Sequence, residues 1–188
     1  MSAEKPTYKW NTIPWKKLAR AVFKLQKRIY RAEARGDVKT ARRLQKLILK
    51  SWSAKCMAVL WVTQDNQGKK TAGVDGVKSL SPEARLKVVR QLKLGSKAKP
   101  TRRVWIPKPG KDEKRPLGIP TIYDRALQAL VKQALEPEWE AKFEPNSYGF
   151  RPGRSCHDAI KQIKLCIQNK AKFVLTQVAS YLFRAANR

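Results

Sequence analysis

Acidic residues are scarce in this 188-residue sequence, where 14 Asp and Glu stand against 42 Lys and Arg and give a formal charge of +28 at pH 7. Histidine occurs once and cysteine three times, without the paired spacing of a disulfide framework or a zinc site. His157 lies beside Cys156, but two adjacent residues make a poor chelate without further ligands. We therefore predict no metal site and expect the thiols to be buried or idle.

Long apolar runs are also missing. No stretch approaches the roughly 20 residues of a membrane-spanning helix, and residues 1–10 contain no apolar signal core. Hydrophobic residues nevertheless make up 42% of the chain, which is enough for a packed core. We expect a cytoplasmic protein with no membrane partner. Its excess of cations favours a polyanion as ligand, because neutralising phosphates releases counterions.

Two basic helices are predicted at the N-terminal end. Apolar residues from Trp15 to Ile29 recur at intervals of three and four, which predicts a helix over 14–35. Gly36 is suited to ending it, and Asp37 to capping a second helix that runs toward Leu60. Only two acids, Glu33 and Asp37, lie between residues 6 and 60, so ion pairs within the helices do not explain the many cations there. Phosphate contact is the preferred explanation, and a solvated charged face is the alternative.

The rest of the chain mixes strands with helices. We predict a loop over 63–81, a helix over 81–94, and strands over 102–107 and 115–120 joined by a basic turn. A helix over 124–135 precedes a separate short segment rich in Glu, residues 136–144. Ser155 and Asp158 form a capping box for a helix to about residue 169, and residues 172–178 read as a buried strand.

The segment 102–160 carries the most specific motifs: IPKP, RPLGIPT, DRALQ and SYGFRPGRS, in that order. It closely resembles the fingers region of group II intron reverse transcriptases, the maturases that bind their own intron RNA. Upstream, WNTIPW, LQKRI and LQKL resemble the N-terminal extension of the same family. The resemblance implies an α+β fold: a basic N-terminal helical hairpin, then a fingers-type β-hairpin with packed helices, forming an incomplete reverse transcriptase fold.

The resemblance also implies roles for individual residues. Positions matching Lys108 and Arg115 face the phosphates of the incoming nucleotide in the family; a generic template contact is the alternative. Tyr148 and Phe150 are candidates for stacking, or else they are core residues and the nearby arginines pair with the glutamates of 136–144. The candidate RNA or template contacts are Lys24, Arg28, Arg31, Arg42, Arg43, Arg102, Arg103, Lys111, Lys114, Arg125, Arg151 and Arg154.

The chain departs from the family pattern after residue 175. The family's polymerase chemistry needs Mg²⁺ held by carboxylates, the first of which should follow the strand KFVL. Here the sequence continues TQVASY, and no Asp or Glu occurs after Asp158. We expect an N-terminal extension and loop over 1–80, a partial fingers and early palm region over 81–175, and a tail without family character over 176–188. A shortened gene or an engineered fragment would each explain that tail.

The leading hypothesis is therefore that the chain binds group II intron RNA, another structured RNA, or a template and primer. We expect this polypeptide alone to have no polymerase activity and to hold no cofactor. One alternative is an accessory basic nucleic-acid-binding protein unrelated to polymerisation. Another is a non-functional truncated product that fails to fold. The apolar strand 172–178 would have no sheet to join, which suggests self-association.

Overall fold

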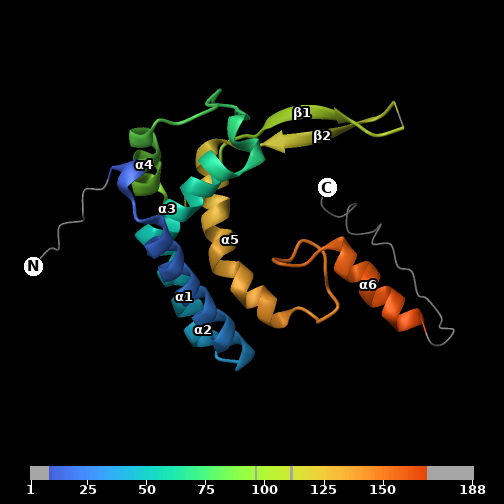
Figure 1. The fold of residues 1–188 in the computed structure, drawn as a ribbon. Coiled ribbons are helices and arrows are strands. Elements are labelled where there is room, and N and C mark those ends of the chain that lie inside the picture. The colour runs from blue at the N-terminus through green and yellow to red at the C-terminus, as the bar shows by residue number, and fades with distance from the viewer. Residues whose placement is uncertain (1–8, 96, 111, 169–188) are drawn as a thin grey trace, which may run out of the picture. The chain divides into compact units, whose positions relative to one another are not determined.

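The computed structural model describes residues 9–95, 97–110 and 112–168, and these divide into two compact units. The N-terminal unit runs to Lys142 and the C-terminal unit begins at Phe143 (Figure 1). The described residues form helices and one two-stranded antiparallel sheet, which confirms the α+β class at this coarse level. The predicted strand 172–178 and the tail 176–188 lie outside the described residues. The boundary predicted at 80–81, between the N-terminal extension and the fingers region, falls inside the N-terminal unit. The division between these two family regions stays a prediction.

The first helical hairpin follows the prediction closely. α1 (Trp15–Ala34) and α2 (Val38–Lys50) lie side by side. Gly36 adopts a φ of +74° between them, a conformation that costs glycine little. The carboxylate of Asp37 accepts a hydrogen bond from the Thr40 amide at 3.0 Å and caps α2. Backbone chemistry readable from the sequence thus sets this turn.

The predicted second helix, however, is wrong in its length. It breaks at Ser51, whose ψ of 126° is extended, and α3 (Trp52–Leu60) starts afresh with the Ser51 hydroxyl accepting from the Ala54 amide. The predicted loop from residue 63 begins in fact with a π-helical turn, Trp61–Asp65, and a 3-10 turn, Gln67–Lys70. α4 (Pro82–Gln91) is capped by Ser81 as predicted but ends before Leu94. A further short 3-10 turn, Trp10–Thr12, precedes α1.

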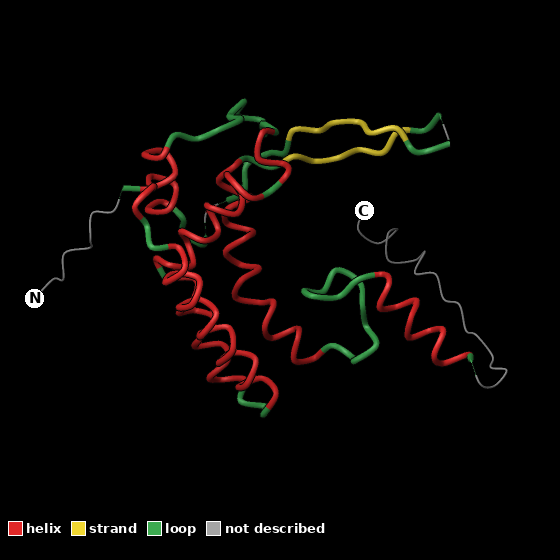
Figure 2. Tube along the Cα trace, in the orientation of Figure 1, coloured by secondary structure: helices red, strands yellow, loops and turns green. Residues whose placement is uncertain are grey.

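The two strands form a hairpin as predicted, within one residue. β1 (Arg102–Pro107) pairs with β2 (Lys114–Ile119), so that Arg103 lies opposite Gly118 and Trp105 opposite Pro116. In the N-terminal unit this ribbon extends away from the helices (Figure 2). Most of its side chains are exposed, because no other element is packed over it within the described part of that unit.

α5 (Ile122–Lys142) corrects another prediction, because the helix expected to stop at Leu135 continues through the glutamate-rich segment. Its buried positions Ala126, Leu130, Ala134 and Pro137 form one stripe that extends up to the proline. α5 packs on α1, α2 and α3; near its end Glu138 accepts a hydrogen bond from Gln45 of α2, and Lys142 pairs with Glu33 of α1. Tertiary packing therefore outweighs the cost of a proline in a helix.

The core of the N-terminal unit lies between these helices in two clusters. The larger includes Ile29, Ile48 and Leu130, all with almost no exposed surface. The smaller joins Trp10, Cys56 and Leu92 from three distant segments. Burial raises the pKa of the Cys56 thiol to about 12, so this cysteine stays protonated. Cys156 and Cys166 are exposed, and all three are free thiols.

The C-terminal unit contains α6 (Cys156–Ile167), preceded by the loop that holds SYGFRPGRS. The predicted capping box is confirmed: the Ser155 hydroxyl accepts from the Asp158 amide, and the Asp158 carboxylate accepts from the Ser155 amide at 2.8 Å. The hydrogen bonds that the Asp158 carboxylate accepts from the Ser155 hydroxyl and then from the Ser155 amide lower its pKa. α6 ends two residues earlier than expected, and none of its residues is buried.

Candidate nucleic-acid interface

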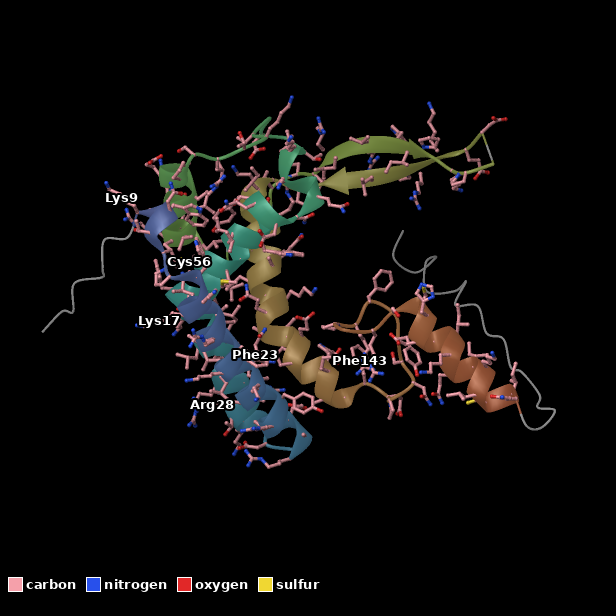
Figure 3. The ribbon with its side chains drawn as sticks, in the orientation of Figure 1. Lys9, Lys17, Phe23, Arg28, Cys56 and Phe143 are labelled. Carbon is pink, nitrogen blue, oxygen red and sulfur yellow. The ribbon has the colours of Figure 1, made fainter. Side chains whose placement is uncertain are left out.

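The outer faces of α1 and α2 carry a continuous set of exposed cations. Because Leu18, Val22 and Ile29 turn one side of α1 into the core, the remaining positions face solvent. Figure 3 shows Lys17 and Arg28 on the outer side of α1 and Cys56 among the helices. The predicted contacts that lie exposed on these two helices are Lys24, Arg28, Arg31, Arg42 and Arg43.

The two acids of this hairpin are both engaged elsewhere. The Glu33 side chain is only 7% exposed and pairs with Lys142 of α5 at 3.0 Å. Asp37 is held by Thr40, and those hydrogen bonds lower the pKa of its carboxyl. Asp37 remains exposed near Arg35 and Arg43 and is the only exposed acid among residues 15–50, all of which are described. The local field of this face stays positive.

The β-hairpin presents a second set of cations. Arg102, Arg103, Lys114 and Arg115 are all exposed on the strands. Lys108 differs, because its ammonium pairs with Glu113 at 2.5 Å and its amide donates to the Glu113 carbonyl at 3.0 Å. The same pair lowers the pKa of Glu113. Lys108 thus closes the turn in addition to any ligand role, and Lys111 lies outside the described residues.

Arg125 does not lie with the outward cations. Its two terminal nitrogens donate to the carbonyls of Gly68 at 2.9 Å and of Thr71 at 2.7 Å, and burial lowers its pKa. The guanidinium therefore braces the segment 66–72 against α5. This geometry argues against the phosphate contact predicted for Arg125, because the donors that would reach a ligand are already directed inward.

The SYGFRPGRS loop is organised by its two arginines. Arg151 donates to the carbonyls of Glu144 and Ser147 at 2.9 and 2.7 Å, and its guanidinium lies 5.1 Å from the Phe143 ring centroid. Arg151 thus contacts the backbone of Glu144, and a pairing of the loop's arginines with the glutamates of 136–144 stays a prediction. Arg154 is exposed and lies 5.6 Å from the Tyr148 ring centroid. Of the two, Arg154 is the better placed for a ligand.

The same loop holds Phe150 fully outward, with a φ of +57° that is rare for an aromatic residue. Phe150 is therefore not a core residue, which leaves the stacking alternative. Beside it, a shallow groove of about 430 Å³ is lined by Tyr148, Gly153, Arg154, Asp158, Lys161, Gln162 and Leu165. Sequence reasoning missed Lys161, although its position one turn after the capping box was a usable signal.

Trp105 is the other residue that sequence reasoning missed. It was placed only within the predicted strand 102–107, with no role of its own, and 56% of its surface is exposed on the hairpin. Strand alternation offered a signal, because Trp105 and Arg103 fall on one face of the ribbon.

The described residues contain no cluster of three or more His, Cys, Asp or Glu side chains able to hold a metal ion. Those residues therefore do not fit the carboxylate-bound Mg²⁺ expected for the family. Among the same residues, no helix is long and apolar enough to cross a bilayer.

Comparison with known proteins identifies the class. Residues 10–92 match the N-terminal domain of reverse transcriptase, and residues 106–183 match the family described as reverse transcriptase (RNA-dependent DNA polymerase). Over most of its length the chain is thus of the reverse transcriptase type, and the mixed helical and two-stranded fold is compatible with part of that fold.

The similar proteins indicate which kind of reverse transcriptase the chain resembles. The chain is 40% identical over 124 residues to Protein YkfC of Escherichia coli (strain K12), covering 61% of this chain and 32% of that protein. It is 43% identical over 102 residues to the group II intron-encoded protein LtrA of Lactococcus lactis subsp. cremoris (53% and 17%), and 33% identical over 165 residues to Maturase-like protein 1 of Euglena gracilis (82% and 34%).

The matched segments span about a third or less of the length of these relatives. Over its N-terminal and fingers region, the chain is therefore a relative of the group II intron-encoded reverse transcriptases and maturases, as the motifs predicted.

Proposed function

We propose that this chain binds structured RNA, of the group II intron or template–primer kind, through the outer faces of α1 and α2 and through the β1–β2 hairpin. One observation carries the proposal: exposed cations cover α1 and α2, while Glu33 is paired with Lys142 and Asp37 is the single exposed acid among residues 15–50. A solvated charged face would be expected to include acids that lower its self-repulsion. This face has only Asp37 as an exposed acid, so most of its cations are left for an external anion.

RNA is the polyanion that the relatives favour. The relative LtrA is described as group II intron-encoded, and other relatives as maturase-like. Phosphate contacts from many flexible cations give affinity that depends strongly on salt, and they fix orientation without reading sequence. Selectivity for folded RNA would then come from the arrangement of the cations on a rigid helical scaffold.

The direct test removes three neighbouring cations of α1. Lys24, Arg28 and Arg31 fall on one stripe of the helix, and changing all three to Gln should weaken binding to a structured intron RNA and reduce the salt slope by about 3. A triple change of the exposed Lys78, Lys87 and Arg90 to Gln is the matched control for net charge. Equal effects of the two triple variants would contradict an α1 interface.

The same titrations separate the second candidate function, a basic accessory nucleic-acid-binding protein. Its only favouring observation is the net charge of +28. Such a protein would bind intron RNA and an unrelated RNA duplex with equal affinity and equal salt slope. The proposed function requires tighter binding to the intron RNA at the same salt concentration.

A nucleotide role for Lys108 and Arg115 follows the family resemblance. Arg115 is exposed, and its planar fork suits bidentate binding of phosphate, so Arg115→Lys should weaken triphosphate binding. In this proposal the polypeptide binds without polymerising and without a cofactor, because no Asp or Glu follows Asp158 to hold the Mg²⁺ expected for the full-length family. Primer extension with Mg²⁺ by the purified 188-residue polypeptide should give no incorporation, and a positive result would overturn this part.

A further inference from the structure

The β1–β2 hairpin has two chemically different faces, which its register defines. Directly opposed residues share a face, and alternate residues of one strand do as well. One face therefore carries Arg102 opposite Ile119, Val104 opposite Leu117, and Ile106 opposite Arg115. The other carries Arg103 opposite Gly118, Trp105 opposite Pro116, and Pro107 opposite Lys114. We name this second set the Trp105 face.

The Trp105 face lies on the opposite side of the ribbon from the residue proposed to bind nucleotide phosphates. Arg115 is opposed to Ile106, and Lys108 continues the same alternation at the end of β1. A nucleotide held by these two residues would therefore leave the Trp105 face open. Any ligand of that face is a separate part of the nucleic acid or a separate molecule.

Trp105 itself contributes little to the stability of the fold. It is 56% exposed, whereas Trp10 in the core is 2% exposed. Its side chain makes no hydrogen bond, ring contact or cation–π contact with another described residue. A two-stranded ribbon is only marginally stable in water, so a large exposed indole on it adds a cost that a ligand would remove.

The neighbours of Trp105 suit an unpaired nucleotide. Arg103 precedes it by one strand repeat and Lys114 follows it diagonally by another, each about 7 Å along the ribbon. Gly118 places no side chain beside Arg103; instead the Thr101 hydroxyl lies 2.9 Å from where a β-carbon would stand. The face is thus an open aromatic platform with a cation on either side, the arrangement used to hold single strands.

We infer that the Trp105 face is a stacking site for an unpaired base of single-stranded RNA, with Arg103 and Lys114 binding the flanking phosphates. The inference rests on the proposed function and adds to it a second nucleic-acid surface. Charge decides for RNA over a protein partner: residues 101–120 hold six Lys and Arg and only two acids. Pro107 and Pro116, which lack amide donors, also make the ribbon a poor template for an added peptide strand.

The test compares three substitutions of Trp105 in the full chain, with a short single-stranded oligouridylate and a blunt RNA duplex as probes. Trp105→Ala should weaken oligouridylate binding about 10-fold, because it removes one stacked base. Trp105→Phe should restore most of the affinity, while Trp105→Leu, which keeps apolar area but no ring, should behave like Trp105→Ala. Duplex binding should be unchanged in all three.

Quenching of intrinsic fluorescence supplies a second measurement. Oligouridylate should quench the parent chain, and Trp105→Phe should lose that quenching while still binding. Circular dichroism checks that each variant keeps the helical signal of the parent.

The outcomes separate the inference from the proposed function. If the parent binds oligouridylate and Trp105→Ala binds it equally well, the stacking site is overturned while RNA binding stands. Equal affinity of Trp105→Leu and Trp105→Phe would also overturn it, because apolar contact alone would then suffice. If the parent binds neither RNA, the proposed function fails as well.

Discussion

The helical bundle of α1, α2, α3 and α5 and the β1–β2 hairpin both present cations, but they hold them differently. In the bundle, a buried core of residues such as Ile29 and Ile48 fixes each basic helix. In the hairpin, no core lies beneath the strands, and Trp105 and Leu117 remain exposed. The difference teaches that the bundle's cations are arranged before a ligand arrives, whereas the hairpin has apolar surface that a ligand would cover.

The largest expected difference between the two regions appears when apolar volume is removed from each, because only the bundle depends on a buried core. Ile29→Ala in the bundle should lower the free energy of unfolding by about 2–5 kcal/mol, because Ile29 is fully buried. Leu117→Ala in the hairpin is the matched control and should change it by less than about 0.5 kcal/mol, since Leu117 is 44% exposed. Urea titrations followed by circular dichroism measure both. Similar losses would mean that the hairpin has a core after all.

A second, smaller effect is expected where the bundle holds its neighbouring loop. Arg125→Lys keeps the positive charge but not the fork that reaches two carbonyls, and it should cost about 1–2 kcal/mol of stability. RNA affinity of the folded variant should not change, because the guanidinium faces inward. Arg102→Lys on the hairpin should show the opposite pattern: unchanged stability and weaker RNA binding. A large loss of affinity in Arg125→Lys with unchanged stability would restore the phosphate contact predicted from the sequence.

The smallest expected effect is on the pH dependence of stability, which depends on the acidic residues of the bundle. Hydrogen bonds from Lys142, and then from Gln45, lower the pKa of Glu138 from its ordinary value of 4.5. Its contribution to stability is therefore present above about pH 4.5 and is lost as the pH falls through the lowered folded value. Glu138→Gln should lower the urea midpoint at neutral pH and flatten the decline between pH 5 and pH 3.

Asp112→Asn, at the hairpin tip, removes one acid without touching this network and should leave that pH profile as in the parent. If Glu138→Gln retains the parent's acid profile, Glu138 is not part of a stabilising pair.

The parts of the fold that local chemistry governs were predictable. Gly36, Asp37 and the Ser155–Asp158 capping box act through their own backbone neighbours, and each ends or starts a helix where expected. The strands follow for the same reason, because prolines and alternation bound them. These features need no knowledge of distant contacts.

The parts that distant contacts govern were not predictable. Pro137 indicated a helix end, yet α5 continues because its far side packs on α1 and α2. Arg125 looked like any other cation until segments more than 50 residues away supplied its acceptors. The exposure of Trp105 was hidden similarly, since only the arrangement of whole elements shows that nothing in the described N-terminal unit covers the ribbon.

The prolines of the hairpin have one more consequence. A ribbon with two open edges and a bare apolar face is a seed for aggregation, because neighbouring chains can extend its ladder. Pro107 and Pro116 withhold amide hydrogens along those edges, and like charges on Arg103 and Lys114 repel a second copy. The hairpin can thus keep an indole exposed without offering its edges for assembly into fibrils.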